Sequence, residues 1–86
     1  MKQFSYTITD PIGIHAGPAL QIIRIARKYR DTAITVTRDD KSVRADGLLR
    51  LIALGARHGD LVTVTCEGPS EMAATVAMQS YFWNHL

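Results

Sequence analysis

The stretch Gly13-Ile14-His15-Ala16-Gly17-Pro18-Ala19 joins an alternating, strand-like run to the first strongly periodic segment of the chain. Gly13 permits a tight turn, and Pro18 suits the first turn of a helix, where a missing N–H costs nothing. His15 is therefore expected at a helix N-terminus, where free backbone amides and the helix dipole favour bound anions. The sequence predicts that a phosphoryl group on His15 would lie in that field.

Composition narrows the class of protein. Eighty-six residues, 47% of them hydrophobic, suit a single domain spanning residues 1–86 with one modest core. The net charge of +2 is too small to indicate nucleic-acid binding by itself. One cysteine, Cys66, excludes an intramolecular disulfide and suits a reducing compartment. Since no apolar run reaches the roughly 18 residues of a membrane helix and the N-terminus lacks a signal peptide's apolar segment, we expect a soluble cytoplasmic protein without membrane insertion.

Hydrophobic periodicity predicts four strands and three helices in the order βαββαβα. Apolar and polar residues alternate in the first two expected strands, and the last expected strand is a continuous β-branched run typical of a central strand. In the expected helices, apolar residues recur every three or four positions. The strands are expected at 2–8, 33–38, 41–45 and 61–66, and the helices at 16–29, 47–54 and 71–84. This pattern predicts an α+β fold in which the helices cover one face of a four-stranded antiparallel sheet.

The last predicted helix carries two apolar stripes, and only one of them can fully face the core. Ser70 is expected to cap the start of this helix. The competing stripes are Ala74, Met78, Tyr81 and Phe82 on one side, and Met72, Val76 and Trp83 on the other.

The segment around His15 resembles the active-site motif of the HPr family, Gly-(Ile/Leu)-His-(Ala/Thr)-Arg-Pro-Ala. These proteins are the histidine-containing phosphocarriers of the phosphoenolpyruvate-dependent sugar phosphotransferase system. The run Lys41–Gly55 is similar to the second signature of the family, and the resemblance covers nearly the whole chain. It implies an open-faced β-sandwich of four strands and three helices.

The resemblance also implies a function. Nδ1 of His15 would accept a phosphoryl group from enzyme I and pass it to an enzyme II A domain, so the protein would be a phosphoryl carrier rather than a turnover enzyme. Histidine suits this role because its ordinary pKa of about 6.5 leaves a neutral nucleophile near pH 7. The backbone N–H groups of Ala16 and Gly17 are expected to stabilise the phosphoryl group. No cofactor and no metal are expected.

Gly17 makes this chain an atypical member, because the family has an arginine there. Losing that fixed positive charge should weaken phosphoryl stabilisation, since charge-assisted contacts are typically worth about 1.5–3 kcal/mol. Two interpretations remain open. Either transfer is slow, or a basic residue from a neighbouring turn substitutes, with Arg24, Arg27 and Arg50 as the candidates.

The family's regulatory serine, which a dedicated kinase phosphorylates in many Gram-positive bacteria, would stand at the start of the second helix. Alignment places Gly47 at that position, so no regulatory serine is expected. Ser42 lies in the preceding strand and does not substitute. We interpret Asp46 as a cap of this helix, with a permanent negative charge at the helix N-terminus as the alternative.

The family's partners present acidic grooves to a basic rim with an apolar centre. Enzyme I and enzyme II A domains are therefore the expected partners, and arginine suits pairing with their carboxylates. Leu51 is assigned either to the apolar centre or to the core. The partner-binding residues expected here are Leu20, Arg24, Arg27, Leu48, Leu49 and Arg50.

Three functions compete at this point. The first is the phosphocarrier. The second is a regulatory or binding module of the same fold that docks the same partners without efficient phosphotransfer. A small basic nucleic-acid binder is the third, but the chain lacks an RNA-binding signature and a concentrated charge patch, so no nucleic-acid partner is expected.

Overall fold

A computed structural model describes all residues, 1–86, and confirms the predicted order of elements. Each boundary lies within one residue of its prediction. The elements are β1 (Lys2–Thr7), α1 (Ala16–Lys28), β2 (Ala33–Arg38), β3 (Lys41–Arg44), α2 (Leu48–Ala53), β4 (Leu61–Glu67) and α3 (Glu71–His85).

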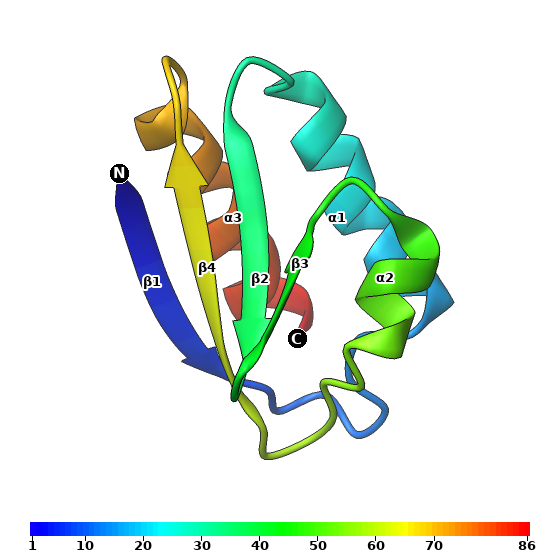
Figure 1. Ribbon diagram of the computed structural model, residues 1–86. Coiled ribbons are helices and arrows are strands. Elements are labelled where there is room, and N and C mark those ends of the chain that lie inside the picture. The colour runs from blue at the N-terminus through cyan, green and yellow to red at the C-terminus, as the bar shows by residue number, and fades with distance from the viewer.

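The four strands form one antiparallel sheet in the order β1-β4-β2-β3, with the helices on one face (Figure 1). Its other face carries hydroxyl groups in register across the strands. Ser5 bonds Thr63 at 2.9 Å, and Thr37 bonds Ser42 at 2.7 Å. The predicted open-faced β-sandwich is therefore confirmed.

The core lies between the sheet and the helices. The strand order confirms the predicted central position of β4. Val62, Val64 and Cys66 of β4 are fully buried, and the residues between them are partly exposed, so the strand is buried on one face only. Leu51 of α2 is also buried, which assigns it to the core.

Helix α3 buries the stripe of Ala74, Met78 and Phe82 and leaves Met72, Val76 and Trp83 exposed. The sequence could not choose between these stripes because both have helical spacing. Ser70 occupies the N-cap, but its side chain makes no cap hydrogen bond; its hydroxyl donates to Asp31 at 3.0 Å instead.

Two connections far apart in the sequence meet at one end of the sheet. The β1–α1 loop and the α2–β4 loop lie side by side there (Figure 1), and the N–H of Ile14 donates to the carbonyl of Ala56 at 3.0 Å. This junction positions the start of α1. No helix of the fold is both long enough and apolar enough to span a bilayer.

Candidate functional site

The loop that leads to His15 is fixed by its own hydrogen bonds. Oδ2 of Asp10 accepts the backbone N–H groups of Ile12 at 3.3 Å and Gly13 at 3.1 Å. Gly13 adopts a positive φ of 87°, which glycine tolerates without strain. Ile14 is buried in the core and anchors the loop. The residue that follows this anchor is His15.

His15 is the N-cap of α1, with extended backbone angles and an exposed side chain. Its backbone N–H donates to the carbonyl of Gly13 at 3.1 Å, and its carbonyl accepts the N–H of Ala19 at 2.9 Å. The imidazole makes no cap hydrogen bond. The backbone of His15 is thus held firmly, while both ring nitrogens remain free for chemistry.

Two backbone donors remain free at this helix end. Ala16 and Gly17 occupy the first two helical positions, and Pro18 has no N–H. A Cβ on Gly17 would lie 3.6 Å from Cε1 of His15, so the imidazole ring lies beside the first turn of α1. The first turn contains no acidic residue that would repel an anion. The arrangement suits a negatively charged group on the histidine.

A groove between α1 and α2 brings several of the predicted partner-binding residues together. Its rim carries Arg24 and Arg27, and Leu20, half exposed, forms part of its apolar lining. Leu49 is 80% exposed but does not line this groove. The lining residues are Leu20, Gln21, Ile23, Arg24, Arg27, Asp46 and Leu48.

Arg50 lies apart from the other predicted rim residues. Its side chain folds over Gly47, where an added Cβ would lie 3.3 Å from Cδ of Arg50. Arg50 lines a different pocket, which it shares with Asp40 and Lys41 of the β2–β3 hairpin. The structure therefore places Arg50 against the β3 side of α2.

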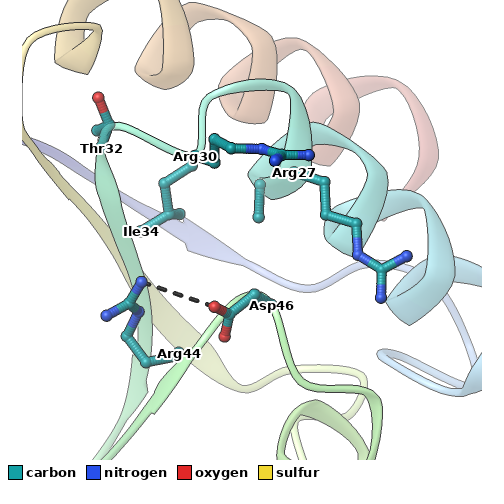
Figure 2. Close-up of a pocket in the computed structure, with 7 residues that line it drawn as sticks. Arg27, Arg30, Thr32, Ile34, Arg44 and Asp46 are labelled. Atoms are coloured by element: carbon teal, nitrogen blue, oxygen red, sulfur yellow. Dashed lines mark ion pairs between the residues drawn. The ribbon is translucent and has the colours of Figure 1, made fainter.

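Asp46 does not cap α2, so that interpretation is wrong. The N-cap of α2 is Gly47, without a side-chain cap bond. Oδ2 of Asp46 instead pairs with Nη2 of Arg44 at 3.6 Å (Figure 2). Arg27 and Arg30 line the same small pocket, and the guanidinium of Arg27 points away from the ion pair (Figure 2). Arg44, two residues earlier at the end of β3, thus offers Asp46 a cation.

Sequence reasoning missed one residue close to the His15 loop. Arg57 lies between the second predicted helix and the last predicted strand, where the sequence gives no sign of a role, yet its Cα would lie 2.7 Å from a Cβ placed on Gly13. The two glycines that flank this loop, Gly55 and Gly59, both have positive φ and are the sequence signal of a tightly folded connection. The fold contains no group of three or more His, Cys, Asp or Glu side chains that could hold a metal ion.

Comparison with known proteins matches the chain to one family. The family model described as "PTS HPr component phosphorylation site" matches residues 2–84. The phosphocarrier protein HPr of Mycoplasma genitalium is 32% identical over 80 residues, which cover 93% of this chain and 91% of that protein. HPr of Vibrio cholerae is 40% identical over 74 residues, covering 86% of each chain.

Solved structures agree as well. The histidine-containing phosphocarrier protein of a Mycoplasma superimposes with a TM-score of 0.92 at 25% identity, covering 96% of this chain and 93% of the other. HPr from Thermoanaerobacter tengcongensis gives a TM-score of 0.81 at 31% identity, covering both chains fully. The family match, these relatives and the shared fold define the phosphocarrier class. The chain belongs to the HPr family of the phosphotransferase system.

Proposed function

We propose that the protein carries a phosphoryl group on His15, accepting it from enzyme I and passing it to an enzyme II A domain. One observation carries the proposal: an exposed histidine occupies the N-cap position of α1, beside the two free amides of Ala16 and Gly17. Free amides at a helix start stabilise a phosphoryl group modestly. Modest stabilisation suits a carrier, which must release the group again.

The reaction proposed at His15 is a phosphoryl transfer. The lone pair of Nδ1 forms an N–P bond as the bond between phosphorus and the donor breaks. The donor keeps the electron pair of the broken bond. In the transfer to the next partner, a nucleophile of that partner bonds to phosphorus as the Nδ1–P bond breaks. The His15 ring keeps the electron pair of that bond, so the carrier returns to its starting state.

The α1–α2 groove is the proposed docking surface for both partners. It combines apolar side chains such as Leu20 and Leu48 with the guanidinium groups of Arg24 and Arg27. Such a basic surface would attract an acidic groove on a partner. Complementary charge of this kind mainly raises the association rate. Leu49 and Arg50 would contact a partner only where it extends across α2.

The test is incubation with phosphoenolpyruvate and purified enzyme I, followed by mass spectrometry. We expect an acid-labile gain of about 80 Da, the mass of one phosphoryl group, which His15→Ala abolishes. The other two histidines provide matched controls, since both are exposed; His58→Ala and His85→Ala should keep the adduct. Absence of an adduct with enzymes I from several bacteria would contradict the carrier proposal.

Gly17 favours a second candidate function, a binding module that docks the same partners without efficient transfer. The position lacks the arginine that the resemblance leads one to expect. This alternative predicts that enzyme I binds the chain, as measured by calorimetry, while the phosphohistidine adduct stays absent. Binding together with a His15 adduct rules this second function out.

A further inference from the structure

The replacement of the family's arginine by Gly17 raises the question of which cation faces the phosphoryl group. The chain has ten lysines and arginines. Two of the arginines are already paired with carboxylates. Nε of Arg38 lies 2.9 Å from Asp60, and Nη2 of Arg44 lies 3.6 Å from Asp46.

The remaining cations on α1 lie too far along the helix. Arg24 is nine residues beyond His15, a rise of about 13 Å at roughly 1.5 Å per residue. Arg27 lies a further turn away, and Lys28 and Arg30 follow at the C-terminal end of the helix. These side chains border the docking groove or the far end of α1 and do not border the histidine.

Among the cations outside α1, only one belongs to a segment that contacts the loop leading to His15. Arg50 and Lys41 share a pocket on the β3 side of α2. Lys2 begins β1, at the end of that strand opposite the His15 loop. Arg57 alone belongs to a segment that packs directly on the loop leading to His15.

Four hydrogen bonds hold the Arg57 loop against the His15 loop. Besides the bond from Ile14 to Ala56, the N–H of Gly59 donates to the carbonyl of Ile8 at 2.8 Å, and the N–H of Ile8 donates to the backbone carbonyl of Asp60 at 2.9 Å. Nδ1 of His58 donates to the carbonyl of Thr9, also at 2.9 Å. The backbone of Arg57 therefore has a fixed position relative to the loop of His15.

The distances allow the Arg57 side chain to reach the histidine. Cα of Arg57 lies 2.7 Å from the position of a Cβ on Gly13. Gly13 and His15 are two residues apart, a span of at most about 7 Å. The guanidinium of Arg57 is exposed and makes no ion pair or hydrogen bond. An extended arginine side chain covers this span.

We propose that Arg57 supplies, from the α2–β4 loop, the positive charge at the His15 phosphoryl group that Gly17 does not supply. This inference rests on the proposed phosphocarrier function. The guanidinium pairs with the phosphoryl oxygens in a charge-assisted, fork-like geometry that arginine provides better than lysine. The positive charge thus comes from the α2–β4 loop instead of from position 17, but it acts on the same phosphoryl group.

Phosphorylation of the whole protein by phosphoramidate tests the proposal without a protein partner. A ring nitrogen of His15 forms the N–P bond as the P–N bond of phosphoramidate breaks and ammonia leaves. A docking defect cannot slow this reaction. The variants are Arg57→Gln, Arg57→Lys, and Arg30→Gln as a control that removes an equal charge at the far end of α1.

We expect Arg57→Gln to slow His15 phosphorylation at least about tenfold, because charge-assisted hydrogen bonds are strong. Arg57→Lys should fall between this variant and the unchanged protein, and Arg30→Gln should react normally. Adding Gly17→Arg to Arg57→Gln should restore the rate to within a few-fold, since Gly17 has room for a side chain beside the ring. Phosphorus NMR should also find a raised second pKa of the phosphoryl group in Arg57→Gln, because the phosphoryl dianion is no longer stabilised by the guanidinium.

The outcomes separate this inference from the proposed function. Equal rates for Arg57→Gln and Arg30→Gln, with the His15 adduct formed normally, would overturn the role of Arg57 and leave the carrier function intact. Failure of the unchanged protein to form any His15 adduct, with phosphoramidate or with enzyme I, would instead remove the carrier function, and the role of Arg57 with it.

Discussion

Nε of Arg38 in β2 donates a hydrogen bond to Oδ2 of Asp60 at 2.9 Å, and the same oxygen accepts the backbone N–H of Arg57 at 2.9 Å. The Arg57 N–H is the main reason that the pKa of Asp60 lies below its ordinary value of 3.8, and the Arg38 guanidinium adds to the effect. One carboxylate thus ties the sheet to the loop that packs on the His15 segment.

We predict that Asp60→Asn removes an acid-sensitive part of the stability. Because the pKa is lower in the folded state, the carboxylate stabilises the fold above the unfolded pKa near 3.8, and this contribution disappears as the pH falls through the folded pKa. Chemical denaturation from pH 6 down to pH 2 checks this. The free energy of unfolding of the variant should fall furthest below that of the unchanged protein above about pH 5, and the difference should shrink toward pH 2. Asp40→Asn is the control, since Asp40 is exposed and makes no hydrogen bond; a deficit independent of pH would refute the linkage.

Gly13→Ala should destabilise the protein and disturb the site. The new Cβ would collide with the backbone of Ala56 and Arg57, and the positive φ would be strained as well. We expect a loss of about 1–3 kcal/mol in the free energy of unfolding. Gly59→Ala is the matched control, because Gly59 has nearly the same φ but open space around it. Equal losses for the two variants would mean that the collision contributes nothing.

Arg24→Glu should weaken docking more than it weakens the chemistry. Arg24 lines the α1–α2 groove, so reversing its charge opposes an acidic partner. We expect a fall of about tenfold in the association rate with enzyme I at low salt, diminishing as salt screens the charges. The rate with phosphoramidate should not change. Arg30→Glu makes the same charge change outside the groove, and an equal effect there would argue against docking at the groove.

Adjacent aromatic residues of α3 should differ sharply in their contribution to stability. Phe82 is fully buried and meets the rings of Phe4 at 5.7 Å and Tyr6 at 6.0 Å, whereas Trp83 is 53% exposed. Phe82→Ala should cost about 3–5 kcal/mol through lost burial and a cavity. Trp83→Ala should cost clearly less, although its ring packs on Tyr6 at 4.6 Å. Thermal unfolding of the two variants checks this order. A larger loss of stability for Trp83→Ala than for Phe82→Ala would contradict the prediction.

Local patterns determined the elements and the placement of His15. Alternation in β2 and the apolar stripe of α1 are properties of neighbouring residues, and so are the breaks at Gly13 and Gly68. Because helix and strand periodicity act over a few residues, the order and boundaries of the elements could be predicted. The position of His15 at the N-cap of α1 follows from the same local signals.

Only the tertiary structure decided which charges meet. Asp46 pairs with Arg44 instead of capping a helix, Arg50 turns to the β3 side of α2, and Arg57 packs against the His15 loop. The placements of Arg50 and Arg57 depend on how separate elements pack, whereas Arg44 and Asp46 are two residues apart and meet where the chain turns after β3. Charged surface side chains carry no periodic signal of their partners. The same limit applies to α3, where two stripes had equal helical spacing and only packing on β1 and β4 selected the buried one. The sequence by itself determined that a histidine begins α1, and the packing of two distant loops determined that the backbone of Arg57 lies against Gly13, on the loop that leads to this histidine.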